Sequence, residues 1–153
     1  MPERFDLTYV GADGGRHRPV MLNRVVLGSM ERFMGVLVEH YAGAFPVWLA
    51  PVQAILLPIT DRVHAYTQEV EGLMQAAGLR VELDSRPETL RYKIREAQLQ
   101  KIPYMVIIGD REAESRTLSP RLRDGTEWKD LPIDTFVQRV QEEGKIPTPV
   151  KSP

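Results

Sequence analysis

The stretch AILLPI at residues 54–59 decides the fold, together with a second apolar run, YMVIIG, at residues 104–109. Both runs are short, apolar along their whole length and accompanied by proline or glycine, which is typical of strands buried on both faces. A third strand is expected over residues 79–84. Helical patterns occupy about 61–77 and 88–101, so strands and helices alternate. This alternation predicts an α/β domain with a parallel core.

The residues after this core predict a change of strand direction. Residues 117–123 have the composition of a strand, and Asp124-Gly125 is a hairpin turn signal. Pro132 then opens a last helix, whose buried stripe is Ile133, Phe136, Val137 and Val140. We therefore expect a mixed, mostly parallel sheet flanked by helices.

A hairpin and a helix are predicted before this domain. Residues 4–10 and 16–27 are β-branched and apolar, and a turn signal over 12–15 joins them as an antiparallel pair. Ser29 is a suitable N-cap for an amphipathic helix with Met30, Phe33, Met34, Leu37, Val38 and Tyr41 along one side. We place the domain boundary near Pro46, which gives segments 1–46 and 47–144. The proline-containing tail, 145–153, is expected to be disordered.

Composition limits the function without naming it. The 153 residues carry a net charge of −1 and contain no cysteine, which excludes disulfides and thiolate zinc sites within the chain. The longest apolar stretch, 45–59, is interrupted by prolines, and the first residues have no apolar signal core. We expect a cytoplasmic protein with neither a membrane span nor a DNA partner.

Positive charge is concentrated in one part of the chain. Residues 86–123 hold nine Lys or Arg against five Asp or Glu, a local charge of 9 − 5 = +4. RNA would favour this segment because each neutralised phosphate releases a counterion. A solvated helix face is the alternative, since Arg91, Lys93 and Arg95 cover much of one predicted helix. Tyr92 and Tyr104 either stack on bases or belong to the core.

Two other site classes gain no support from motifs. His17, His40 and His64 are not spaced as metal ligands, and Gly14-Gly15 lacks the Lys-Ser/Thr of a phosphate-binding loop. Neither a histidine metal site nor nucleotide hydrolysis is therefore indicated by the residues themselves.

Three longer stretches resemble the threonyl-tRNA synthetase family. The run RPVMLNRVVLGSMERF (18–33) and its continuation HYAGAFPVWLAPVQ (40–53) are similar to class II motif 3 and the segment after it. The likeness resumes at YKIREAQLQKIPY (92–104) and GDRE (109–112). It implies the end of a catalytic domain followed by an anticodon-binding domain. Threonine-specific tRNA is the implied partner.

The resemblance assigns three residues to the adenylate-forming site. The motif 3 arginine is Arg32, which implies contact with the phosphates of ATP, used with Mg²⁺ in the complete enzyme. Ser29 would lie near the amino acid, and Gly28 would allow close approach of the backbone to the nucleotide.

The family's zinc is not expected here. The family places a zinc-binding histidine where this chain has Asn23, and an amide is a poor zinc ligand. The remaining zinc ligands, motifs 1 and 2 and the homodimer interface of the complete enzyme belong to sequence before Met1. We therefore expect that this chain alone neither binds zinc nor activates threonine.

The same resemblance assigns the anticodon contacts to Lys101, Glu112 and Arg121. A fourth family contact, an asparagine after Arg86, is Pro87 here, and a family glycine is replaced by Arg91. Proline has no side-chain amide, so discrimination at one base position is in question.

Three hypotheses remain open. The chain is part of a threonine--tRNA ligase completed by another chain, a free-standing tRNA-binding or regulatory module, or a relic used only for protein contacts. The exposed flank of residues 1–46, which lacks sheet partners, is expected to associate with other apolar surfaces.

Overall fold

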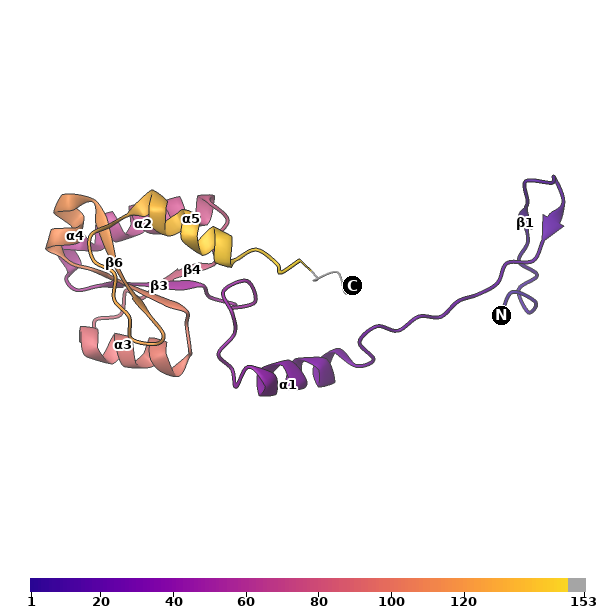
Figure 1. The fold of residues 1–153 in the computed structure, drawn as a ribbon, viewed down its shortest axis with the longest axis horizontal. Helices are drawn as coiled ribbons and strands as arrows, with labels where there is room; N and C mark the ends of the chain where they lie inside the picture. The colour runs from indigo at the N-terminus through magenta and orange to yellow at the C-terminus, as the bar shows by residue number, and fades with distance from the viewer. Residues whose placement is uncertain (149–153) are drawn as a thin grey trace. The chain divides into compact units, whose positions relative to one another are not determined.

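The computed structural model describes residues 1–148, and the chain divides into two compact units, residues 1–36 and residue 37 onward. The second unit contains the sheet and both hydrophobic clusters of buried residues (Figure 1).

The sheet of the second unit has five strands in the order β4-β3-β5-β6-β7. These are β3 (Ala54–Pro58), β4 (Val81–Leu83), β5 (Tyr104–Ile108), β6 (Thr117–Leu122) and β7 (Leu131–Pro132). β3 pairs in parallel with both β4 and β5, whereas β6 is antiparallel to β5 and β7 is antiparallel to β6. The predicted mixed α/β sheet is confirmed.

Helices cover both faces of this sheet. α2 (His64–Ala76), which follows the 3-10 turn η1 (Asp61–Val63), lies on one face with α5 (Ile133–Glu143), and α3 (Leu90–Leu99) lies on the other (Figure 1). Leu56 packs in the cluster with α2 and α5, while Ile55 and Leu57 pack in the cluster with α3. Because successive residues of β3 face opposite helices, the whole strand is apolar.

Two elements were not predicted from the sequence. α4 (Asp110–Ser115) is a single polar segment, and β7 contains only two residues. α4 has no apolar stripe, but at its start the carboxylate of Glu112 accepts a hydrogen bond from the backbone N–H of Gly109, which is one half of a capping box. Such short elements depend on their neighbours more than on hydrophobic periodicity.

The first unit confirms the predicted hairpin but not its length. β1 (Tyr9–Val10) and β2 (Arg16–His17) are antiparallel and have two residues each, not the seven and twelve expected. Residues 1–7 form helical turns instead, and residues 18–27 have no strand partner. Leu22 and Val26 are 88% and 80% exposed. An apolar, β-branched run forms a strand only when a neighbouring strand supplies its hydrogen bonds.

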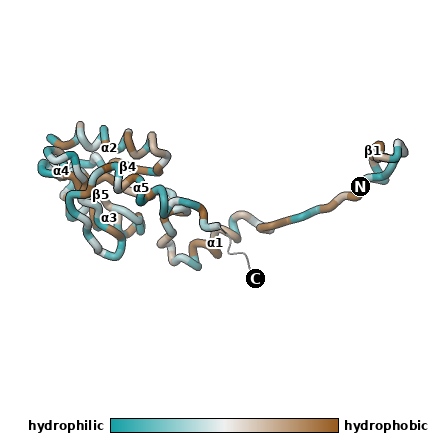
Figure 2. Tube along the Cα trace, turned by 45° about the horizontal axis from the view of Figure 1, so that its top comes forward, coloured by the Kyte–Doolittle hydropathy of each residue, from teal (hydrophilic) through white to brown (hydrophobic). Residues whose placement is uncertain are grey.

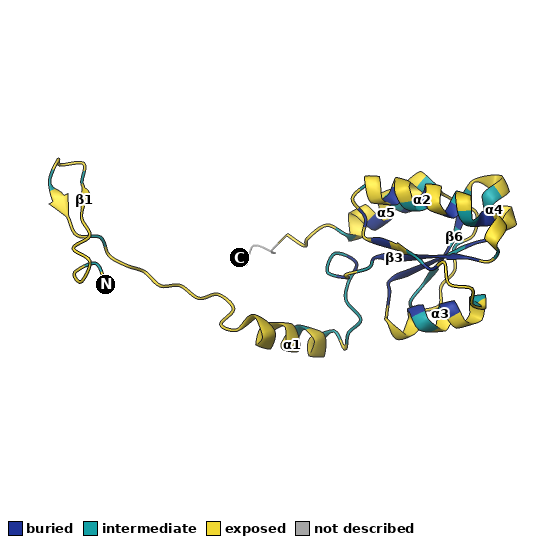
Figure 3. Ribbon diagram, turned by 180° about the vertical axis from the view of Figure 1, so that it is seen from behind, coloured by how far each residue is buried: buried dark blue, intermediate teal, exposed yellow. Residues whose placement is uncertain are grey.

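The helix predicted after Ser29 is confirmed as α1 (Met30–His40). The backbone N–H of Arg32 donates to the Ser29 hydroxyl over 3.3 Å, so Ser29 is its N-cap. None of the α1 residues is buried (Figure 3). The hydropathy colouring shows several apolar residues along residues 18–27 just before this helix (Figure 2).

Candidate nucleic-acid interface

β6 presents polar side chains on the sheet face that it shares with α3. Leu118 is fully buried in the cluster beneath α2 and α5, so its neighbours Ser119 and, two residues on, Arg121 point to the opposite face. α3 packs on that face over Ile55, Leu57 and Met105 of β3 and β5. The side chain of Arg121 remains 30% exposed.

A pocket of about 160 Å³ lies between β6, α4 and residues 127–130. Charged groups of both signs line it, among them Arg111, Glu112, Arg121, Glu127 and Lys129. Two of the predicted anticodon residues, Glu112 and Arg121, are therefore brought to one pocket, although they are nine positions apart in the chain.

Glu112 is fixed by two hydrogen bonds. The backbone N–H of Gly109 donates to its carboxylate over 2.9 Å, and the Ser119 hydroxyl donates over 2.8 Å. Burial raises the pKa of Glu112, but the hydrogen bonds from Ser119 and the backbone outweigh burial and hold the pKa below its ordinary value. The pocket thus contains an ionised, oriented hydrogen-bond acceptor.

Arg121 supplies donors to the same pocket. Its Nη1 donates to Glu127 over 3.2 Å, whereas its buried Nε has no acceptor among the residues that the structure describes. A buried N–H without an acceptor is costly, so this Nε is an unsatisfied donor in the structure.

A second hollow, a groove of about 490 Å³, runs between α3 and Arg121. Arg91, Arg95 and Gln98 line it from α3, with Leu90 and Ile94 beneath them. The sequence counted Arg91 and Arg95 in a basic stretch that favours RNA, with a solvated helix face as the alternative, but it did not place them beside Arg121. Their spacing of four residues was a signal that they share one side of the helix, but it did not show which strand that side meets.

Lys101 lies apart from these two hollows. It follows α3 in a left-handed conformation, with φ of 57°, and its Nζ donates to the carbonyl of Ala42. It lines a third hollow with Gly43, Phe45 and Ile102. The structure therefore joins Glu112 and Arg121 but does not bring Lys101 into their pocket.

The two candidate tyrosines differ in environment. Tyr104 is 2% exposed, its hydroxyl donates to Glu143 over 2.6 Å, and burial followed by that carboxylate raises its pKa. Tyr104 is a core residue. Tyr92 is 43% exposed and remains available to a ligand.

The candidate adenylate residues adjoin one another at the start of α1. Ser29 donates to the carboxylate of Glu31 over 2.7 Å, which lowers the pKa of Glu31. Gly28 has a left-handed φ of 69° with no atom within 4 Å of the place a Cβ would occupy, and Arg32 is exposed. The guanidinium of Arg32 is therefore accessible to an anion.

The donor set for a metal does not fit. Asn23 is an exposed amide, and residues 1–148 contain no group of three His, Cys, Asp or Glu side chains placed to hold an ion. We therefore assign no zinc ion to these residues. In the same residues, no helix has the length and hydropathy that crossing a membrane requires.

Comparison with known proteins places these features in context. The sequence model of a family described as "Anticodon binding domain" matches residues 53–143. Threonine--tRNA ligase of Acetivibrio thermocellus is 56% identical over 142 residues, which cover 93% of this chain and 22% of the relative. The enzyme of Syntrophotalea carbinolica is 55% identical over 143 residues, covering 94% and 22%. The chain thus spans less than a quarter of the length of these relatives.

Solved structures agree. The RNA binding domain of threonyl-tRNA synthetase from Cryptosporidium parvum Iowa II superposes with a TM-score of 0.83 at 36% identity, covering 97% of this chain and 38% of that one. Prolyl-tRNA synthetase of Cryptosporidium parvum, with halofuginone and AMPPNP, has a TM-score of 0.67 at 21% identity, covering 94% and 31%. The second similarity concerns the fold alone.

Proposed function

The chain belongs to the anticodon binding domain family, and from that premise we propose that residues 47–144 bind the anticodon loop of threonine-specific tRNA. The observation that carries the proposal is the position of Arg121. Its side chain, which is 30% exposed, lines both the pocket and the groove.

Glu112 and Arg121 are the proposed base readers. An unpaired base presents donors and acceptors along its edges, and proteins read these edges where the bases of a loop are unstacked. The ionised carboxylate of Glu112 accepts from a base N–H, and the guanidinium of Arg121 donates to a base oxygen or nitrogen. Because Ser119 and Gly109 hold Glu112 in place, little side-chain freedom is lost on binding.

Arg91 and Arg95 are proposed to bind the RNA backbone along the groove. Their guanidinium groups flank Arg121, and arginine binds phosphate oxygens in a bidentate geometry. Such contacts position the loop without reading its sequence and make the affinity depend on salt. This grouping favours RNA binding over a merely solvated helix face.

Lys101 is proposed as a peripheral contact. An ammonium group has three N–H donors, and the bond to Ala42 uses one of them. Pro87 cannot replace the amide that the family has there, so we expect relaxed discrimination at the base that such an amide would read.

Residues 1–46 are proposed to belong to the catalytic domain of a threonine--tRNA ligase. Arg32 would hold phosphate oxygens of ATP, with Ser29 and Gly28 beside it. Bound ATP with Mg²⁺ would supply the adenylyl group that joins the carboxylate of threonine, and pyrophosphate would be the leaving group. Within residues 1–148 the guanidinium of Arg32 has no ion-pair partner, which supports a role toward an anion. The complete enzyme would be a cytoplasmic homodimer.

The test is fluorescence anisotropy with threonine tRNA and a non-cognate tRNA across a salt series. We expect selective binding by the full chain, weakened about 5- to 150-fold by Arg121→Ala, the range for losing one base contact. Lys101→Ala should cost less and weaken both tRNAs alike. Arg62→Ala, at an exposed arginine in η1, is the matched control and should bind as the unchanged chain does.

The outcomes separate the two tRNA-binding hypotheses, the ligase part and the free-standing module, from the relic. Selective binding without any other chain supports a working anticodon reader. Equal and weak binding to both tRNAs that vanishes at moderate salt would leave only a basic surface, and no binding at all would favour a relic. Unchanged affinity in both Arg121→Ala and Lys101→Ala would contradict the anticodon assignment.

A further inference from the structure

An arginine at the carboxyl ends of the parallel strands is held in one orientation. The Asp84 carboxylate, only 4% exposed, accepts from Nε of Arg86 over 2.9 Å and from Nη2 over 2.7 Å. It also accepts from the backbone N–H of Arg86 over 3.1 Å. The Arg86 side chain is nevertheless 50% exposed. Its guanidinium is therefore fixed on one edge and open to solvent on the other.

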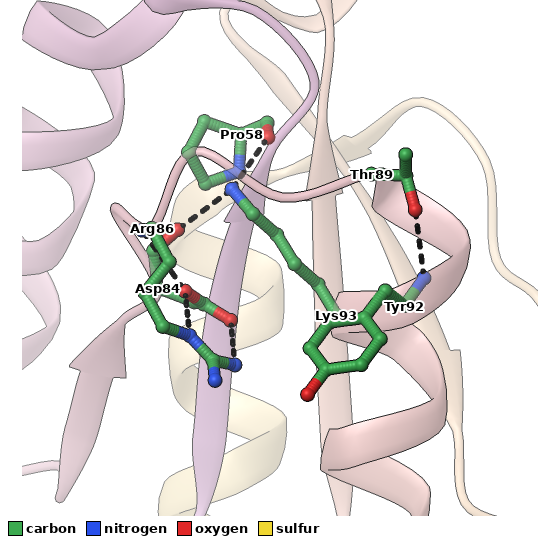
Figure 4. Close-up of polar contacts among 6 residues, drawn as sticks. All are labelled: Pro58, Asp84, Arg86, Thr89, Tyr92 and Lys93. Carbon is green, nitrogen blue, oxygen red and sulfur yellow. Dashed lines mark hydrogen bonds and ion pairs between the residues drawn. The ribbon is translucent and has the colours of Figure 1, made fainter.

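A buried lysine fixes the same loop to α3. Nζ of Lys93 donates to the carbonyl of Asp84 over 3.0 Å and to that of Pro58 over 3.5 Å, and this side chain is buried (Figure 4). The ends of β3 and β4 are thus both tied to the first turns of α3. Thr89 caps that helix through the backbone N–H of Tyr92.

Tyr92 completes the cluster. Its ring extends on the same side as the guanidinium of Arg86, whose Cζ lies 5.9 Å from the ring centroid (Figure 4). The ring is 43% exposed. The preceding residues, Leu90 and Arg91, line the groove beside Arg121, so the first turn of α3 carries both the groove and this exposed ring.

We propose that Tyr92 and Arg86 form a stacking platform for one unpaired base of the RNA loop, an inference that rests on the proposed function. Unpaired bases stack on aromatic rings and on the planes of guanidinium groups. Here one group of each kind is exposed, and Asp84 immobilises the arginine before the ligand arrives.

Charge favours a base over a phosphate at this platform. Asp84 already balances the charge of Arg86, and Glu96 lies close enough to Arg86 to act on it electrostatically. Stacking tolerates any base because every base has an aromatic face. The platform therefore adds affinity without base discrimination, in contrast to Glu112 and Arg121.

The test uses the full chain and an anticodon stem-loop RNA. Tyr92→Ala should weaken binding about 5- to 150-fold, the range for one lost base stack, with the same loss for altered anticodon sequences and an unchanged salt slope. Tyr92→Phe should bind within about twofold of the unchanged chain, because the ring is retained. Tyr92→Leu keeps apolar bulk without a ring and should bind as weakly as Tyr92→Ala.

An abasic scan of the loop identifies the stacked nucleotide. At that nucleotide, removing the base and substituting Tyr92→Ala should have non-additive effects, because each removes the same contact. Arg86→Lys keeps the charge but loses the plane and should weaken binding. Arg116→Lys is its matched control, since Arg116 also pairs with a carboxylate, Glu69, and lies 5.7 Å from the ring centroid of Tyr66.

Two results would overturn the inference in distinguishable ways. Tight binding of the unchanged chain together with unchanged binding by Tyr92→Ala and Tyr92→Leu would remove the platform and leave the anticodon assignment intact. Failure of the unchanged chain to bind any stem-loop would overturn both.

Discussion

Residues 1–36 and the unit that begins at residue 37 are both rich in apolar side chains, but only the second buries them. No residue of the first unit is buried, whereas the second contains two hydrophobic clusters around one sheet (Figure 3). Both units form helices where the local patterns predict them, but the strand pattern over residues 18–27 of the first unit forms no strand. A local hydrophobic period thus indicates which helix or strand a segment can form, whereas burial of its apolar side chains requires a partner surface.

The largest expected effect is on the free energy of unfolding, because only the second unit has a packed core. Phe136 is fully buried and its ring meets that of Tyr104 edge-on at 5.4 Å. Phe136→Ala should lower the free energy of unfolding by about 3–5 kcal/mol. Leu22→Ala, at a side chain 88% exposed, should change it by less than about 0.5 kcal/mol. Urea denaturation followed by circular dichroism measures both.

A comparable loss in both variants would show that residues 18–27 have a packing partner in solution. Measuring Leu22→Ala at several protein concentrations then identifies a second copy as that partner, because association makes stability depend on concentration.

The sequence predicted most of the second unit for reasons visible in particular residues. Residues 54–58 are apolar at every position because α2 and α3 cover opposite faces of β3. α4 and the two-residue β7 were missed because neither has enough residues to show a period. In the first unit, residues 18–27 satisfied the composition of a strand, but composition carries no information about whether a second strand is present.

The candidate site likewise contains some residues that the sequence predicted and some features that only the structure shows. Glu112 and Arg121 were predicted from the family resemblance, and the fold brings them to one pocket. Arg95 was predicted only as one of the basic residues of segment 86–123, because the structure alone shows that it lines the same groove as Arg121. The buried Nε of Arg121 and the fixed orientation of Arg86 are properties of three-dimensional packing, and no spacing in the sequence encodes them.

A medium effect concerns the pH dependence of the second unit. Hydrogen bonding from Arg86 outweighs burial and holds the pKa of Asp84 below its ordinary value of 3.8. A lowered folded-state pKa contributes stability above the unfolded value, and this stability is lost as the pH falls through the folded pKa. Asp84→Asn should therefore cost about 1–3 kcal/mol at pH 6, because the guanidinium and the backbone N–H of Arg86 lose a charged acceptor that is itself buried.

Unfolding free energies of both chains from pH 6 to pH 2.5 measure this dependence. The difference between the unchanged chain and Asp84→Asn should shrink as the pH falls from 3.8, where Asp84 of the unfolded chain becomes protonated, through the lower folded-state pKa. A difference in unfolding free energy that stays constant down to pH 2.5 would mean that Asp84 stabilises the loop by its shape and not by its charge. Residues 1–36 should contribute nothing to this difference in unfolding free energy, because Asp84 lies in the second unit.

The smallest expected effect compares two helix caps of the same chemistry. Ser29 caps α1 and Thr89 caps α3, each through a backbone N–H three residues on. Replacing either by alanine should cost its helix about 1 kcal/mol. The consequences differ, because α3 buries Lys93 and Ala97 while α1 buries none of its residues.

The amides of α3 exchange only when its packed core opens. Thr89→Ala should therefore lower the free energy of unfolding and leave the pattern of amide exchange unchanged. α1 has eleven residues, and an isolated helix of that length is marginal in water, so its amides should exchange quickly and Ser29→Ala should reduce their protection further. Hydrogen exchange by mass spectrometry resolves the two helices. Protection in α1 equal to that in α3 would mean that its apolar side is covered in solution, and protection that rises with protein concentration would identify a second copy as the cover.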